Sequence, residues 1–269
     1  MKDARRGAAG RRGRANAAWI LSALLAGTAS TAWAITDEIQ VYVDDVNARG
    51  ESELELHVNT TPKGRDTPDY EGDVPPQHGV RITPEFSWGL GNDFDWGLYL
   101  PTATDADGDF HAGGAKLRVK WLPVHGREGE GGWYFGINNE LSDVNKSFSE
   151  SRWNDEVRVI GGYRGRGWLI GVNPIFEWAL SPGFRGSPDF SLAWKAVHDV
   201  TPGFALGVEY YEDLGTLADR LPRDEQSRTL YAIGEIERKS WSLNFGVGHG
   251  LTPATDDWTV KAIIGFTWD

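Results

Sequence analysis

Residues 79–100 read GVRITPEFSWGLGNDFDWGLYL, and apolar and polar side chains alternate along them. The apolar positions before the turn at residues 91–93 are Val80, Ile82, Pro84, Phe86, Trp88 and Leu90. A period of two is typical of a β-strand with two unlike faces. The apolar face carries large rings where the strand ends, and the other face carries ionisable groups. This pattern favours a membrane barrel, in which lipid contacts the outside and water or paired charges fill the inside.

The same alternation recurs along the chain and, counted from Glu53, predicts about twelve strands. An even number of strands is typical of bacterial outer-membrane barrels. Short connections alternate with longer and more charged ones; the short ones are residues 91–93, 164–166, 201–203 and 238–240. Short turns on one side and long loops on the other are typical of the periplasmic and extracellular ends of such barrels.

Most tryptophans fall at the predicted strand ends, as in the two aromatic girdles of a membrane barrel. We therefore predict an all-β fold, a transmembrane antiparallel up-and-down β-barrel of about twelve strands, with an additional N-terminal strand at residues 38–46. Three placements of that strand are open: in the lumen, below the barrel, or paired at the seam. Pro84 and Pro174 stand in mid-strand, where a proline removes a ladder hydrogen bond, so we expect local bulges there. The alternative is a soluble sandwich or lipocalin-like barrel with tryptophan in its core.

Residues 1–34 are expected to be a signal peptide. Six basic residues, from Lys2 to Arg14, precede an apolar stretch at residues 17–27 that is too short to span a bilayer. Ala32 and Ala34 fit the small-x-small cleavage pattern, so the barrel is predicted to occupy residues 35–269. The alternative is a basic tail beside an anchor helix.

Charge and cysteine content exclude several functions. The chain has 27 basic and 39 acidic residues. Residues 1–34 hold six of the basic residues and one acidic residue, so 21 and 38 remain, a net charge of −17. A chain this acidic is a poor ligand for nucleic acid, and no nucleic-acid partner is expected. Because the chain has no cysteine, disulfides, thiol catalysis and cysteine-ligated metals are excluded.

Six segments of the mature chain resemble known sequences. They are EIQVYVDDVNARGESELELHVN (residues 38–59), GVRITPEFSWGL (79–90), GLYLPT (97–102), KLRVKWLP (116–123), FSESRW (148–153) and GLTPATDDWTVKAI (250–263). They resemble proteobacterial outer-membrane proteins grouped near the phenol-degradation meta-pathway outer-membrane family. The resemblance covers nearly the whole mature chain. It implies an outer-membrane barrel and a link to the metabolism of aromatic compounds, but it fixes no site.

The ionisable residues on the polar faces of the predicted strands are the candidate site. In this register the lumen and solute-binding residues are Glu53, Glu55, His57, Arg81, Glu85, Lys116, Arg118, Lys120, Glu140, Glu156, Arg158, Glu177, Lys195, Glu209 and Lys261. They line a polar path or binding site in one interpretation. In the other they pair with one another and fill a narrow barrel. The basic stripe Lys116, Arg118 and Lys120 either selects anions or neutralises acidic neighbours.

Signals for metal binding and catalysis are weak. Residues 104–110 carry Asp105, Asp107 and Asp109 at alternate positions, as in a calcium loop, but Lys116 stands where the closing glutamate would be. We predict no metal, no cofactor and no catalytic residue. Neither G-x-S-x-G nor H-E-x-x-H occurs. Residues 148–154 resemble a serine-and-asparagine segment of outer-membrane phospholipases, without the neighbouring histidine that a serine nucleophile needs.

The sequence therefore predicts an outer-membrane barrel of a Gram-negative bacterium that passes a small solute or binds it in the lumen. The resemblance implies that the solute is an aromatic compound. The expected partners are outer-membrane lipid and lipopolysaccharide, the outer-membrane assembly machinery and the solute, and the barrel is expected to be a monomer. Two alternatives are an outer-membrane hydrolase acting on lipid or peptide, and a structural barrel whose loops bind surface partners.

Overall fold

The computed structural model describes residues 38–126, 131–184 and 186–268, and the predicted signal peptide, residues 1–34, lies outside them. The described residues form twelve strands that close a barrel and two further short strands. The barrel strands are β1 (Ser52–Lys63), β2 (Val80–Gly91), β3 (Phe94–Tyr99), β6 (Gly114–Val124), β7 (Gly132–Val144), β8 (Trp153–Gly165), β9 (Trp168–Ala179), β10 (Asp189–Thr201), β11 (Phe204–Thr216), β12 (Arg228–Glu237), β13 (Trp241–Gly250) and β14 (Trp258–Trp268). The short strands β4 (Thr102–Thr104) and β5 (Phe110–Ala112) form a hairpin beside β2.

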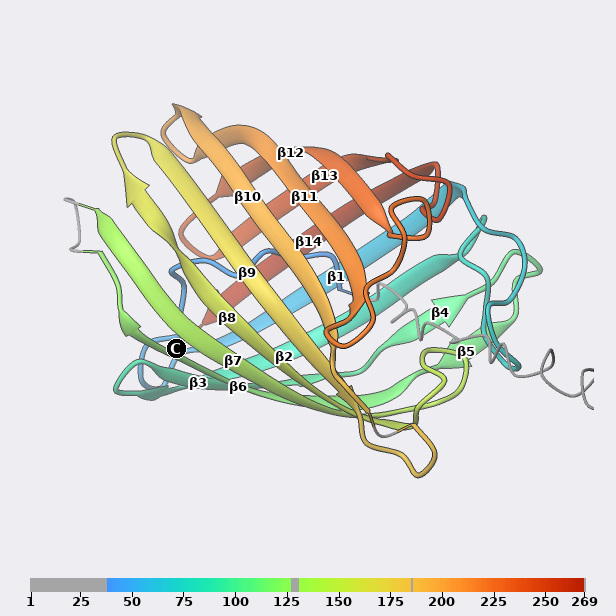
Figure 1. Cartoon of the computed structure of the whole chain (residues 1–269). Helices are drawn as coiled ribbons and strands as arrows, with labels where there is room; N and C mark the ends of the chain where they lie inside the picture. Colours follow the sequence, from blue (N-terminus) through green and yellow to red (C-terminus); the bar gives the residue numbers. More distant parts are fainter. Residues whose placement is uncertain (1–37, 127–130, 185, 269) are drawn as a thin grey trace, which may run out of the picture. The chain divides into compact units, whose positions relative to one another are not determined.

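Each barrel strand runs antiparallel to its neighbours, and β1 closes the ring by pairing with both β14 and β2 (Figure 1). The predicted antiparallel up-and-down barrel of about twelve strands is confirmed. Closure gives every barrel strand a hydrogen-bonded neighbour on both sides, which is the condition for a sheet to span lipid.

Tight turns reverse the chain at one rim. Gly91, Asn92 and Asp93, between β2 and β3, all have positive φ, at 81°, 54° and 65°, and Gly167 between β8 and β9 has a φ of 74°. Glycine, asparagine and aspartate adopt positive φ at the lowest cost, which is why these residues form the turns. We call this rim the short-turn end. The opposite rim, with longer connections such as residues 64–79, is the long-loop end.

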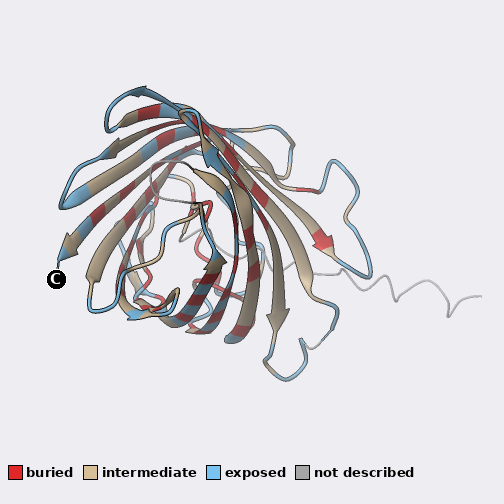
Figure 2. Cartoon of the chain, turned by 90° about the vertical axis from the view of Figure 1, so that its left-hand side faces the viewer, coloured by how far each residue is buried: buried red, intermediate tan, exposed pale blue. Residues whose placement is uncertain are grey.

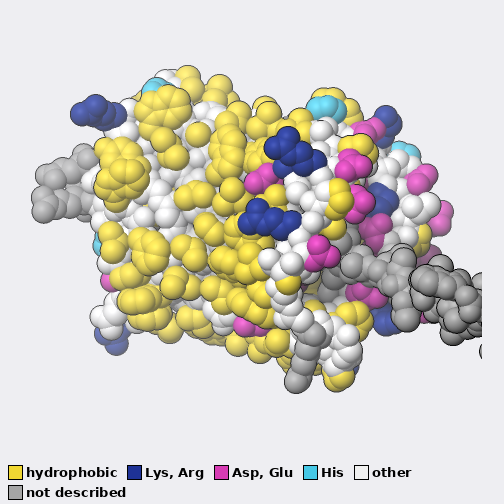
Figure 3. All heavy atoms as spheres, in the orientation of Figure 1, with side chains coloured by type: hydrophobic (Ala, Val, Ile, Leu, Met, Phe, Trp, Pro, Cys, Tyr) yellow, Lys and Arg dark blue, Asp and Glu magenta, His cyan; other side chains and the backbone are white. Residues whose placement is uncertain are grey.

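Rows of apolar side chains lie on the outside of the barrel, and Figure 3 shows them over the face in view. On β6, Leu117 and Val119 are 47 % and 44 % exposed, whereas the alternating Arg118 and Lys120 are 4 % and 6 % exposed. A soluble sandwich or lipocalin-like barrel would bury the apolar row and expose the charged one, so those alternatives do not fit. The outward apolar band is the surface that a membrane barrel presents to lipid.

Tryptophan rings mark both rims of that band. Trp133 and Trp168 are exposed at the short-turn end, and Trp153 and Trp258 are exposed at the long-loop end. Indole rings prefer the two membrane–water interfaces, so their placement agrees with a barrel that spans a bilayer. No helix among the described residues is long and apolar enough to cross a membrane.

The bulges predicted at Pro84 and Pro174 are not formed. The pairing of β2 with β3 and then with β4 omits the two pairs around Pro84 and resumes in the same register. The pairing of β8 with β9 omits two pairs around Pro174, again without a shift. Each proline therefore interrupts the ladder with only one of its two neighbouring strands. Proline lacks just one backbone N–H, and the neighbouring strand on that side can separate from it locally.

Residues 38–46, expected as an additional strand, form none. Because β1 already pairs on both sides, the closed ring offers no free edge to this segment. Instead residues 38–47 run irregularly inside the barrel, where the end view in Figure 2 shows chain within the ring of strands. The chain crosses the rim over Gly89, where a Cβ would lie 1.8 Å from the Ala48 carbonyl oxygen, so glycine is required there. We call residues 38–47 the lumenal segment.

A charge placed at mid-height on the outer face tests the contact with lipid. Val172, in the middle of β9, is 40 % exposed, and Val200, near the short-turn end of β10, is 55 % exposed. We expect Val172→Arg to lower the free energy of unfolding in lipid vesicles by about 2–4 kcal/mol and the control Val200→Arg by about 0–1 kcal/mol, because the cost of the charge depends on its depth. Equal effects in a guanidinium titration would contradict a lipid-facing band.

Candidate lumenal site

The lumenal segment is held by hydrogen bonds to the barrel wall rather than by strand pairing. The Asn173 amide on β9 accepts the Tyr42 N–H at 2.7 Å and donates to the Tyr42 carbonyl at 2.9 Å. On the opposite side, the Tyr42 and Tyr99 hydroxyls are 2.6 Å apart. Arg158 donates to the Gln40 carbonyl at 3.1 Å, and its guanidinium lies over the Tyr42 ring. These contacts come from three different strands, so the segment occupies the lumen.

Apolar contacts add to these hydrogen bonds. Ile39 and Tyr42 are 3 % and 5 % exposed and belong to one buried cluster with wall residues that include Leu122, Ile160 and Leu169. Buried apolar side chains stabilise such packing in proportion to the area they remove from water. The lumenal segment is therefore packed against the wall at several points.

One ion-pair group lies on β2, β3 and β6. Arg118 donates to Glu85 at 2.5 Å, to the Tyr99 hydroxyl at 3.1 Å and to Asp95. Lys120 lies 3.4 Å from the same aspartate and 3.8 Å from Asp45 of the lumenal segment. Lys116, the third member of the basic stripe, pairs with Glu140 at 3.3 Å. All three cations of the stripe are thus paired with carboxylates.

A second ion-pair group lies on the far side of the lumen. Lys195 is 2.5 Å from Glu235 and 3.5 Å from Glu209, which also pairs with Lys261. Lys261 donates in addition to the Ile39 carbonyl at 2.9 Å. Four strands, β10, β11, β12 and β14, contribute to this group, and Lys261 connects it to the lumenal segment.

The remaining predicted residues are distributed along the wall. Arg158 pairs with Glu156 at 2.9 Å, and the buried Arg81 donates to the Val74 carbonyl at 3.3 Å. Glu177 stands across the ladders from Glu156 and Asp189. The predicted site residues therefore do not form one cluster. They divide among several ion pairs at different heights.

A cavity of about 470 Å³ lies between the lumenal segment and the wall from β8 through β14 to β1. Gln40 and Asp45 line it on the inner side, and Glu53, Lys195 and Glu235 line it on the wall side. Residues of the short turns, such as Gly203, also line the cavity, so it reaches the short-turn end. Six acidic and three basic side chains surround it, which leaves an excess of negative charge.

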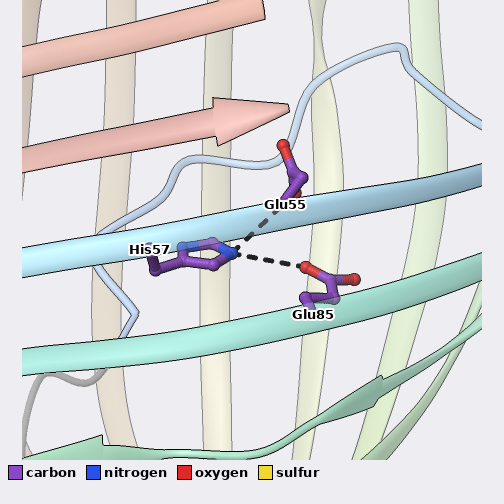
Figure 4. Close-up of side chains that lie close together, drawn as sticks. All are labelled: Glu55, His57 and Glu85. Carbon is purple, nitrogen blue, oxygen red and sulfur yellow. Dashed lines mark hydrogen bonds and ion pairs between the residues drawn. The ribbon is translucent and has the colours of Figure 1, made fainter. Parts of the chain in front are cut away.

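His57 brings together two carboxylates from neighbouring strands (Figure 4). Its Nε2 is 3.4 Å from Glu85 Oε2 and 3.9 Å from Glu55 Oε2. The imidazole is completely buried, and its Nδ1 has no hydrogen-bond partner among the described residues. Within the described part of the chain, these three residues are the one group of three or more candidate ligands whose ligand atoms all lie within 4.8 Å of one another.

Hydrogen bonds between near neighbours in the chain organise residues 104–110 and the serine-and-asparagine segment, residues 148–154. Asp105 accepts the N–H groups of Asp107 and Asp109 and lies 2.8 Å from His111 Nε2, and this last hydrogen bond lowers the pKa of the Asp105 carboxyl. A carboxylate used in this way shapes a turn rather than a calcium loop. Asn154 donates to Ser149 at 3.3 Å, and the hydrogen bonds described for these two residues involve no histidine.

Sequence reasoning missed the residues that bind the lumenal segment. Asn173 and Tyr99 stood on the polar faces of their strands, but nothing in the periodicity distinguished them from other inward residues. The sequence places Tyr42 in an additional strand, for which the lumen is one of three open locations, whereas the structure buries it between opposite walls without strand pairing. The two adjacent acids Asp44 and Asp45 were the usable signal, because they interrupt the alternation of the predicted strand.

No protein-family model and no curated protein matches the chain. The fold is similar to that of solved outer-membrane barrels. The COG4313 outer membrane channel from Pseudomonas putida F1 has a TM-score of 0.59 at 11 % identity, over 86 % of this chain and 100 % of that one. KdgM porin has a TM-score of 0.52 at 9 % identity, over 81 % of this chain and 98 % of that one. At these identities the likeness concerns the fold.

Removing the Asn173 amide tests how the lumenal segment is held. Asn173→Ala leaves the backbone N–H and carbonyl of Tyr42 buried without partners, which costs about 1–3 kcal/mol of stability for each group. Hydrogen exchange in residues 38–47 is therefore expected to accelerate by about tenfold or more. Asn138→Ala is the matched control, because Asn138 is equally buried and its amide has no partner among the described residues. Equal exchange rates in both variants, measured by mass spectrometry, would contradict this role of Asn173.

Proposed function

We propose that this protein is an outer-membrane channel for small polar solutes, which move through the cavity between the lumenal segment and the wall. The short-turn end would face the periplasm, as in other bacterial barrels. The observation that carries the proposal is the cavity of about 470 Å³, which reaches the short-turn end and is lined by charged side chains. The structural likeness to an outer membrane channel and to a porin supports it at the level of fold.

Filling by the lumenal segment makes the passage narrow. On one side of the lumen, Tyr99 of β3 is engaged with Tyr42 and Lys120 of β6 with Asp45, and the open volume lies toward β8–β14. A narrow passage lined by charged groups selects permeants by charge as well as by size. The acidic excess around the cavity favours cations.

The chemical class of the solute follows from the lining. Charged side chains, among them Glu237 and Arg238, line the cavity near the short-turn end. Such a lining suits a small solute with a charged or polar substituent. An aromatic framework for that solute rests on the resemblance to proteins linked to phenol degradation alone. Placement in the outer membrane, the monomeric state, and contacts with lipopolysaccharide and the assembly machinery belong to the same proposal.

Deleting the lumenal segment tests whether it limits passage. A variant that lacks residues 38–47 is expected to conduct several-fold more current per channel in planar bilayers than the full mature chain, because the space the segment occupies becomes open. The folded state of each protein is verified by its shift in gel mobility on heating. A folded deletion variant with unchanged conductance would contradict a channel limited by this segment.

The acidic excess predicts the sign of ion selectivity. With a salt gradient across the bilayer, the reversal potential is expected to show a preference for potassium over chloride. Neutralising Glu237 and Asp199, which both line the cavity, is expected to reduce that preference. Neutralising Asp107, in the turn between β4 and β5 and away from the cavity lining, serves as the control. Anion preference in the wild-type protein would contradict passage through this cavity.

A further inference from the structure

We propose that Glu55, His57 and Glu85 bind a divalent transition-metal ion inside the barrel. The strand register places Glu55 of β1 directly opposite Glu85 of β2. Two like charges that face each other across a ladder destabilise the pair unless a cation lies between them. His57 comes two residues after Glu55 on the same strand face, so its imidazole reaches the same point (Figure 4).

The distances suit a shared ion better than hydrogen bonds. A hydrogen bond between a nitrogen and an oxygen usually spans about 2.7–3.2 Å. His57 Nε2 is 3.4 Å and 3.9 Å from the carboxylate oxygens of Glu85 and Glu55, and a single N–H cannot point at both. Bonds of about 2.0–2.2 Å from tetrahedral zinc to nitrogen and oxygen separate the two ligand atoms by roughly 3.3 Å. A small adjustment of Glu55 would complete that spacing.

The charges around the group leave one carboxylate to be neutralised. Arg118 binds Oε1 of Glu85, which leaves Oε2 facing the imidazole. Among the described residues, the ion pair recorded for Glu55 is the one with His57. A carboxylate in a largely enclosed position is costly unless it is paired or coordinates a metal. Arg118 is itself balanced by Asp95, so it does not offset Glu55 as well.

A fourth ligand is available from the lumenal segment. The Gln40 amide nitrogen lies 3.4 Å from Glu55 Oε2, and the Gln40 Oε1 atom is buried without a hydrogen-bond partner among the described residues. Rotating the amide by half a turn exchanges its oxygen and nitrogen, so the oxygen would face the group. Gln40 and Glu55 also line the cavity, which gives an ion a path from the short-turn end.

The donor set indicates the class of ion. One imidazole with carboxylate oxygens suits zinc and neighbouring transition metals, whereas calcium and magnesium prefer oxygen ligands alone. Such an ion would link β1, β2 and the lumenal segment. Metal binding by this group does not require solute passage, because the three side chains meet whether or not the barrel conducts.

Calorimetric titration of the full mature protein in detergent with Zn²⁺ tests the site. We expect one Zn²⁺ per chain, not displaced by an equal concentration of Ca²⁺, and an affinity lowered about tenfold or more in both His57→Gln and Glu55→Gln. Glu53→Gln, on the same face of the same strand, is the matched control and should bind Zn²⁺ like the wild type. Failure of the wild-type protein to bind Zn²⁺, or equal binding by the folded variants, would overturn the proposal.

A second measurement does not depend on variants. Crystals of the wild-type protein soaked in Zn²⁺ should show an anomalous scattering peak within about 2.0–2.2 Å of His57 Nε2 and of one oxygen from each glutamate. A peak confined to other residues, or no peak, would overturn the proposal even if a substitution at His57 prevents folding. Conductance is measured without added Zn²⁺, so failure of the metal site and failure of the channel are distinguishable.

Discussion

The pairing of β1 with both β14 and β2 is the constraint on which the rest of the structure depends. Lipid offers no hydrogen-bond partners, so a sheet that crosses it has to close. Closure turns one face of each strand outward and the other inward. Because side chains alternate between the two faces, successive residues point alternately to the lipid and to the lumen. The exposed Leu117 and Val119 and the buried Arg118 and Lys120 on β6 are direct consequences.

The interior then has to be filled by groups that satisfy one another. Removing a charge from water costs several kcal/mol, and opposite charges offset this when their geometry is good. The groups around Arg118 and Lys195 meet that requirement across three and four strands, and the lumenal segment supplies backbone carbonyls and Asp45 as further partners. Between the segment and β8–β14 the filling is incomplete, and there the cavity remains. The proposed passage and the proposed metal group both border this gap.

Much of the fold was predictable from the sequence because it depends on local periodicity. The alternation through Val80, Ile82 and Phe86 gave the strand and its outward face, and the turn residues Gly91, Asn92 and Asp93 gave the reversal. The number of strands followed from repetition of that pattern. The inward direction of residues such as Glu85 and Lys261 followed from the same register, since a side chain's face is fixed by its parity within the strand.

Tertiary structure decided which inward groups meet and what occupies the lumen. Glu55 and Glu85 are 30 positions apart, and only the β1–β2 register places them opposite each other around His57. Asn173 and Tyr42 are 131 positions apart and meet because the ring encloses residues 38–47. By itself, then, the sequence determined the strands, their faces and the class of barrel, which rest on interactions between near neighbours. The ion pairs, the lumenal segment and the cavity rest on contacts across the ring, and these exist only once closure has fixed the distance between distant strands.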